Sequence, residues 1–131
     1  MDPWQVLAEQ IRDETSLPVG VSVYDGPTNQ LVPPAVVIRP DSPWLEVARQ
    51  YCLDLQRYVA VAVVSASDAS SGLSVLYRIQ WAVRAATEAL GNGWEWVSVG
   101  APVIDQSTGS AYLAAPIRLE YRNSNEPQEA S

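Results

Sequence analysis

The hydrophobic pattern is clearest in residues 59–90, where an apolar run, a polar stretch and a helical repeat follow one another. Residues 59–64 are small or β-branched apolar residues, which predicts a buried strand. Residues 65–72 are small and polar and supply side chains that can cap a helix. The following helix is expected to end at Gly91, a residue that accepts the left-handed conformation of a helix C-terminus. Its apolar residues recur at steps of three and four and therefore share one face: Leu73, Leu76, Ile79, Val83, Ala86 and Leu90.

The N-terminal third predicts one helix and two short strands. Residues 2–14 form an amphipathic helix in this interpretation, with Asp2 as the N-cap and Pro3 at the first helical position. Residues 19–24 alternate between apolar and polar or small side chains, as a half-buried strand does. Residues 35–38 are all apolar and predict a second short strand, which prolines confine on both sides.

Residues 44–57 fit two interpretations. A short helix would place Trp44, Val47 and Tyr51 on one side, whereas an extended chain would alternate Tyr51, Leu53 and Leu55 with polar residues. We favour an extended segment that begins near Cys52 and continues into the strand at 58–64.

The C-terminal third predicts a long antiparallel hairpin. One strand covers residues 94–104, with Val97, Val99, Ala101 and Val103 on one face, and the return strand covers residues 111–122. Pro116 lies inside the return strand, so we expect an edge or a bulge at that position. The last residues, 123–131, carry no large apolar side chain and are predicted to form a disordered C-terminal tail.

Together these elements predict a single α+β domain over residues 1–122. Its sheet is mainly antiparallel, a long helix packs on one face, and a shorter helix lies at the N-terminus. No apolar run approaches the length of a membrane span, so no membrane association is expected.

The amino-acid composition argues against most catalytic mechanisms. The chain contains no His and no Lys, so the usual general base, the commonest metal ligand and Schiff-base chemistry are all missing. The single cysteine, Cys52, permits no internal disulfide, and the 15 acidic residues are scattered rather than paired. We therefore expect no enzyme activity, no cofactor and no metal site. The net charge of −7 argues against tight wrapping of nucleic acid through its phosphates.

One stripe on the long helix is a candidate interaction site. Its residues follow one another at helical spacing on the side opposite the apolar face: Tyr77, Trp81, Arg84 and Glu88. Aromatic residues and Arg are enriched at protein interfaces, so a subunit interface is one interpretation. The other is an ordinary solvent face in which Trp81 lies on Arg84.

The order of segments resembles that of the tail terminator and related head–tail joining proteins of long-tailed bacteriophages. The resemblance covers residues 1–122 and rests on segment order, loop composition and size. It is carried by Val-Tyr-Asp-Gly-Pro at 23–27, Val-Pro-Pro-Ala-Val-Val-Ile at 32–38, Pro-Trp-Leu at 43–45, Val-Ser-Val-Gly-Ala-Pro at 97–102 and Ala-Tyr-Leu-Ala-Ala at 111–115.

The resemblance implies a structural virion protein, assembled in the host cytoplasm, that forms a homo-oligomeric ring, usually of six subunits. Such a ring caps the tail tube and joins it to the head connector proteins, and DNA passes through its channel without specific binding. We expect the hairpin tip to contact another virion protein through Asp105, Gln106, Ser107, Thr108 and Gly109. Two alternatives stay open: a head-completion or connector subunit between portal and tail, and a small ligand-binding or regulatory domain of a cell.

Overall fold

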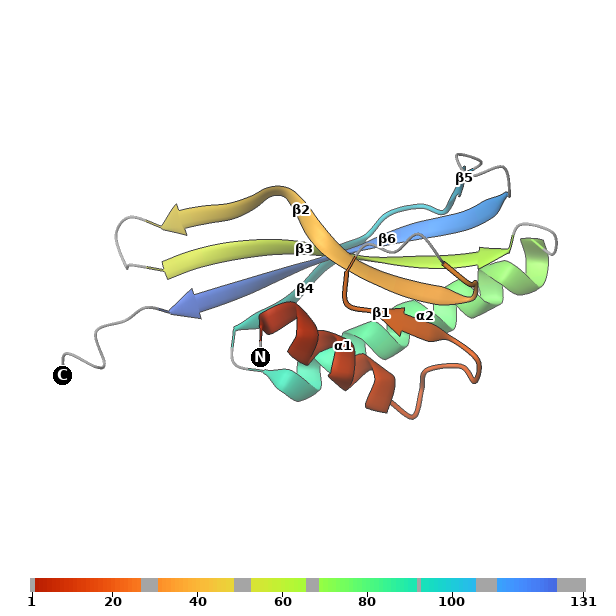
Figure 1. Cartoon of the computed structure of the whole chain (residues 1–131), viewed down its shortest axis with the longest axis horizontal. Coiled ribbons are helices and arrows are strands. Elements are labelled where there is room, and N and C mark those ends of the chain that lie inside the picture. Colours follow the sequence, from red (N-terminus) through yellow and green to blue (C-terminus); the bar gives the residue numbers. More distant parts are fainter. Residues whose placement is uncertain are drawn as a thin grey trace.

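The computed structural model describes residues 2–26, 31–48, 53–65, 69–91, 93–105 and 111–124, and for residues 42–48, 53–54, 69–70, 105 and 123–124 it describes the backbone alone. Figure 1 shows two layers, a twisted sheet and two helices that cover one of its faces. This is the predicted α+β architecture, with an N-terminal helix and a second, longer helix.

Both helices begin and end where local chemistry favours it. Helix α1 (Pro3–Asp13) is held at its start by the Asp2 backbone N–H, which donates to Oε1 of Gln5 at 2.9 Å. Helix α2 (Ala69–Leu90) starts four residues earlier than the apolar repeat predicts. It ends at Gly91, whose φ of +57° confirms the expected left-handed residue and whose N–H donates to the Thr87 carbonyl at 3.1 Å.

Six strands form one mixed sheet in the order β1-β2-β3-β6-β4, with β5 also paired to β6. Only β1 and β2 run parallel, and the other pairs are antiparallel. The strands are β1 (Ser22–Tyr24), β2 (Ala35–Ala48), β3 (Leu53–Ser65), β4 (Trp94–Val99), β5 (Val103–Asp105) and β6 (Tyr112–Ser124).

Strand β2 is much longer than the predicted strand at 35–38. It reaches Ala48 because β3 offers a partner along almost its whole length, although the register shifts between Pro40 and Leu45. Beyond residue 37 no described strand pairs with the other side of β2, so prolines in this part interrupt no second ladder. The helical alternative is therefore wrong for residues 44–48, and the extended interpretation is confirmed for residues 53–57.

The predicted C-terminal hairpin is confirmed, but its first strand is broken into β4 and β5. Strand β6 is central rather than an edge, since it pairs with β3 on one side and with β4 and β5 on the other. The Pro116 carbonyl accepts a hydrogen bond from the Gly100 N–H at 2.7 Å, so the missing N–H of Pro116 faces the gap between β4 and β5. The irregularity expected at Pro116 is therefore found in the strands that face it, as the break between β4 and β5.

Two further predictions about this hairpin need correction. Val99 lies opposite Ile117, which faces the core, whereas Val103 lies opposite Ala114 on the other side of the sheet. The two valines do not share a face, because the chain advances four positions from Val99 to Val103 while β6 advances only three from Ile117 to Ala114. Strand β6 also continues past Arg122 to Ser124, so the expected tail begins two residues too early, and residues 125–131 lie outside the described part.

The core lies between the helices and the covered face of the sheet. Ile79 and Val83 of α2 are fully buried there, as are Leu7 and Ile11 of α1. Apolar residues of β2, β3 and β6 complete this cluster: Val36, Ile38, Tyr58, Ala60, Ala62, Val64, Leu113, Ala115, Ile117 and Leu119. The opposite face carries ion pairs between strands, including Arg57–Glu120 at 3.5 Å and Arg118–Asp41 at 3.6 Å.

Candidate functional site

The predicted stripe on α2 consists of two exposed aromatic residues and two charged residues that pair with each other. Tyr77 and Trp81 pack edge to face with their ring centroids 6.2 Å apart, and their side chains are 63% and 45% exposed. Arg84 and Glu88 follow one turn later and form an ion pair at 3.9 Å. The structure therefore brings all four residues together on α2, with the aromatic pair open to solvent.

Arg84 also ties α2 to the sheet. Its guanidinium carbon lies 5.2 Å from the ring centroid of Trp81 and 5.1 Å from that of Trp96, so the cation is held between two indoles. Trp96 is on β4, and the stripe pattern on α2 gave no sign of its involvement. Since Arg84 stabilises the packing of α2 on β4, a change at Arg84 affects folding as well as any interface.

A groove begins next to Tyr77 and runs toward the break between β4 and β5. Leu73 and Tyr77 form its helical side, Val99 and Pro102 form its strand side, and its volume is about 330 Å³. It exists because the chain leaves the sheet at Gly100, where a Cβ atom would lie 2.7 Å from the Pro116 ring. Only glycine allows the chain to cross Pro116 so closely.

Most of the exposed apolar residues in the described part of the chain belong to the elements that border this groove or continue from it. Nine large hydrophobic residues are exposed among those described, and seven of them belong to α2, β4 and β5. We call these seven residues the apolar edge: Leu73, Tyr77, Trp81, Val97, Val99, Val103 and Ile104. A concentration of exposed apolar residues on neighbouring elements is typical of a surface that binds another protein.

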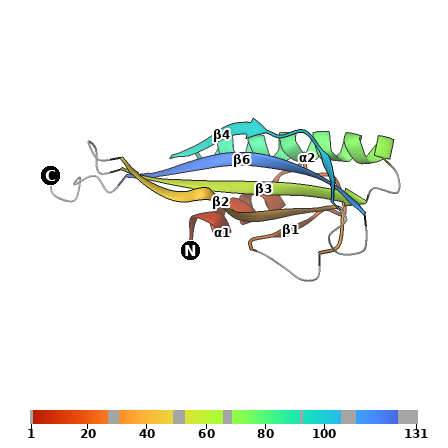
Figure 2. The same ribbon diagram turned by 90° about the horizontal axis from the view of Figure 1, so that it is seen from above.

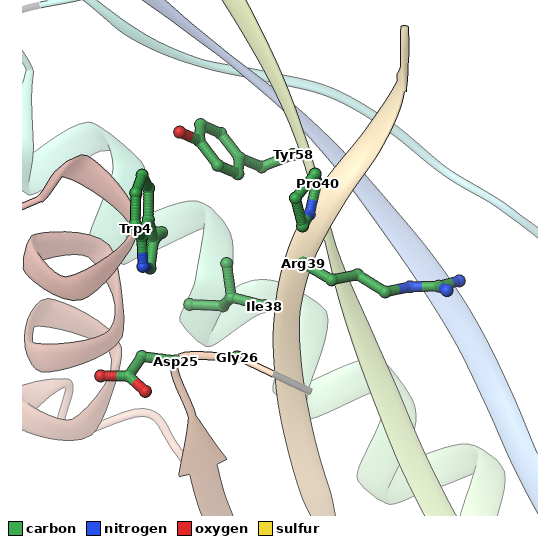
Figure 3. A pocket seen from close by; sticks show the side chains of 7 residues that line it. All are labelled: Trp4, Asp25, Gly26, Ile38, Arg39, Pro40 and Tyr58. Atoms are coloured by element: carbon green, nitrogen blue, oxygen red, sulfur yellow. The ribbon is translucent and has the colours of Figure 1, made fainter. Parts of the chain in front are cut away.

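A second concave site lies on the other side of the helical layer, between α1 and the sheet (Figure 3). Its volume is about 200 Å³, and nearly all of its lining is apolar. The Trp4 and Tyr58 rings are 6.1 Å apart, and the Tyr58 hydroxyl donates to Oε1 of Gln56 at 2.6 Å. Figure 3 shows Ile38 pointing into this space and Arg39 pointing away from it. We call this site the Trp4 hollow; it is lined by Trp4, Asp25, Gly26, Ile38, Arg39, Pro40 and Tyr58.

The sequence did not indicate the Trp4 hollow. Trp4 lies in the helix predicted at residues 2–14 and Tyr58 in the strand predicted at 58–64, and neither local pattern indicates that the two meet. The two meet only because α1 packs against a sheet whose strands come from distant parts of the chain. A third indole continues the aromatic contact, since Trp94 lies 5.7 Å from Tyr58.

The predicted contact loop is only partly described. Asp105 ends β5, whereas Gln106, Ser107, Thr108 and Gly109 lie outside the described residues. The expected contact of this loop with a partner protein therefore stays a prediction.

The linings of both concave sites are mainly apolar. Within the described residues, no three His, Cys, Asp or Glu side chains gather closely enough to hold a metal ion. None of the helices in the described segments has both the length and the apolar character needed to cross a bilayer. What these surfaces offer is apolar and aromatic contact area, which suits binding to another macromolecule.

No family model matches the chain, and the comparison with curated proteins also gives no match.

Proposed function

We propose that the protein is a structural subunit of a bacteriophage tail, a tail terminator that forms a ring on the end of the tail tube. The ring, of six subunits by resemblance, joins the tube to the head connector and lets DNA pass. Subunits meet through the apolar edge. The observation that carries this proposal is the concentration of exposed hydrophobic residues on the neighbouring elements α2, β4 and β5.

The chemistry of the apolar edge supports a permanent contact. Val103 and Ile104 are consecutive strand residues that point to opposite faces of the sheet, yet they are 59% and 65% exposed. In a two-layer monomer one of the two is expected to be covered. A neighbouring subunit that covers this part of β5 removes both side chains from water, and each contributes about 25 cal/mol for every Å² that becomes buried.

The charge of the chain also agrees with a DNA channel. A ring of subunits that each carry a net charge of −7 repels phosphates, so DNA moves through without adhering. The Trp4 hollow gives little support to a small-ligand-binding function, because its 200 Å³ is below the range of about 300–1,000 Å³ that is usual for ligand pockets.

Complementation of a phage that lacks the gene for this chain tests the proposal. Tyr77→Glu removes an exposed aromatic side chain from the apolar edge and adds a charge there, so folding is expected to survive. Val19→Glu is the matched control, because Val19 is fully exposed and lies outside the apolar edge. We expect the control to restore infectious particles, and Tyr77→Glu to leave headless tails of abnormal length in electron micrographs.

Normal tails in the Tyr77→Glu complementation would contradict the proposal for this surface. Normal tails without any copy of the gene would contradict the terminator function itself. Binding to isolated portal complexes instead of tube ends would assign the chain to the connector class.

A further inference from the structure

Strand β4 has one side that no other strand in the described part of the chain occupies. It is the last strand in the order of the sheet, and it pairs with β6 alone. The Gly93 carbonyl and the Gly100 N–H both bond to β6 and therefore point toward it. Because the backbone groups of successive strand residues point to alternate sides, those of Trp96 and Val99 point away from β6. Strand β4 thus presents hydrogen-bonding groups at the rim of the sheet.

The two rims of the sheet differ in their protection against a further strand. On the opposite rim, β1 has only three residues, and the part of β2 beyond it contains Arg39, Pro40 and Pro43. Proline and charged residues on an edge strand hinder the addition of another strand. Strand β4 contains no proline, Lys or Arg, and its one acid, Glu95, forms an ion pair with Arg122 at 3.7 Å. Strand β4 is therefore the edge that is open to pairing.

The exposed aromatic pair of α2 belongs to the same side of the molecule. Figure 2 shows α2 and β4 on one side and α1 and β1 on the other. Arg84 joins the two elements, since its guanidinium lies over Trp81 of α2 and over Trp96 of β4. Tyr77 and Trp81 nevertheless remain 63% and 45% exposed. A molecule that adds a strand to β4 therefore also comes to lie beside these two rings.

This side of the molecule is also nearly neutral. Elements α2, β4 and β5 together carry two Arg and three acidic residues, which sum to −1 in a chain whose net charge is −7. Residues 2–14 alone carry four acids and one Arg, which sum to −3. Two copies of the chain therefore repel each other least when they meet through the β4 side.

We infer that β4 pairs antiparallel with β4 of a second copy of this chain, and that the two α2 helices then lie side by side. An edge strand complements itself, because a two-fold axis perpendicular to the sheet gives each copy the donors and acceptors that the other lacks. The axis keeps both helices on the same face of the joined sheet. A second copy thus brings a strand for β4 and an aromatic cover for Tyr77 and Trp81 at once.

This pairing gives the apolar edge a partner before any tail tube is reached. A symmetric contact closes after two copies, so it builds a dimer and no ring. The proposed ring needs the same residues, so the dimer has to separate before its subunits join at a tube end. The role of the dimer as a reserve form rests on the proposed function, whereas the pairing itself does not.

Cross-linking between identical positions tests the symmetry of the contact. A two-fold axis near the middle of β4 brings Val97 of the two copies within about 8 Å, either directly opposite or diagonally. The full chain with Cys52→Ser and Val97→Cys, treated with a thiol-specific linker of about that span, should give a covalent dimer as the main product. Val19→Cys in the same background is the matched control, because Val19 is fully exposed and lies outside the apolar edge. It should stay monomeric on a denaturing gel.

Sedimentation of the purified full chain measures the strength of the pairing. Wild type and Val19→Glu are expected to be dimers at about 0.1 mM, with no larger species. Tyr77→Glu changes both halves of a symmetric contact and brings two like charges together, so the dimer should weaken at least about 30-fold. A melting temperature equal to that of the Val19→Glu control shows that the weaker dimer does not come from unfolding.

Two outcomes would overturn the inference: a wild-type chain that stays monomeric at about 0.1 mM, or a Val97→Cys chain that cross-links no better than Val19→Cys. A head-to-tail contact gives the second outcome, because it brings Val97 to a different residue of the neighbour. The complementation assay keeps the two proposals apart. Normal tails with Tyr77→Glu, together with a cross-linked dimer, would reject the proposed function and leave the pairing standing. Defective tails without cross-linking would do the reverse.

Discussion

Gly93 holds the turn that connects α2 to β4, and its replacement by alanine should be costly. Its φ is +98°, and a Cβ atom would lie 2.5 Å from the Arg122 backbone oxygen. The Gly93 carbonyl also accepts a hydrogen bond from the Arg122 N–H at 2.9 Å, so the strands cannot separate without losing it. Gly20 is a matched control, since its φ is +91° but a Cβ atom there meets nothing within 4 Å.

The two substitutions differ mainly in the steric term. A positive φ costs an alanine about 1–2 kcal/mol, and lower entropy of the unfolded chain returns about 0.4–1 kcal/mol. Gly20→Ala should therefore lose about 1 kcal/mol or less. Gly93→Ala adds about 1–3 kcal/mol for the overlap with Arg122, which gives about 3 kcal/mol in total.

Thermal unfolding measures the difference between these variants. At about 4 °C per kcal/mol for a domain of this size, Gly93→Ala should melt about 8 °C below Gly20→Ala. Urea unfolding at fixed temperature supplies the free energies independently. Equal losses for the two variants would refute the close approach of β6 to this turn and the pairing of β4 with β6 near Trp94.

The remaining predictions concern the core, the Arg84 contacts, the C-terminus and metals. Ile79→Ala removes a fully buried side chain and should cost about 2–5 kcal/mol in urea unfolding, so a loss under about 1 kcal/mol would show that Ile79 is not in the core. Arg84→Met keeps an apolar stem between Trp81 and Trp96 but removes the cation, and should cost about 1 kcal/mol; an unchanged midpoint would contradict that contribution. A chain that ends at Ser124 should melt within about 2 °C of the full chain, and a fall of about 10 °C would show that the last residues are docked. Dialysis against a chelator should leave the melting temperature unchanged, and one equivalent of zinc in elemental analysis would contradict this.

Sequence alone predicted the elements whose signals are local. Helix α1 carries its cap, its proline and its apolar face within one short segment, and α2 is closed by Gly91. The C-terminal hairpin was also predictable, because its two strands are adjacent in sequence and a turn separates them. These features depend on neighbours within a few residues, which a single sequence displays directly.

Features that depend on distant partners were not predictable. Strand β2 extends to Ala48 because β3 pairs with it, and nothing in residues 39–48 alone favours that length. Val99 and Val103 face opposite sides because of a gap that fits Pro116 on the facing strand. The same limit applies to the candidate sites: the α2 stripe was visible as a helical pattern, whereas the indole of Trp96 and the Trp4 hollow arise only from tertiary packing.

Electron microscopy of tail tubes incubated with the purified chain tests the central claim most directly. The tubes are assembled from the tail tube protein of the same genome, and Tyr77→Glu serves as the negative control. We expect a ring of this chain on one end of each tube, and an end to further elongation when more tube protein is added. Tubes whose ends stay bare and that elongate equally with and without the chain would contradict the claim.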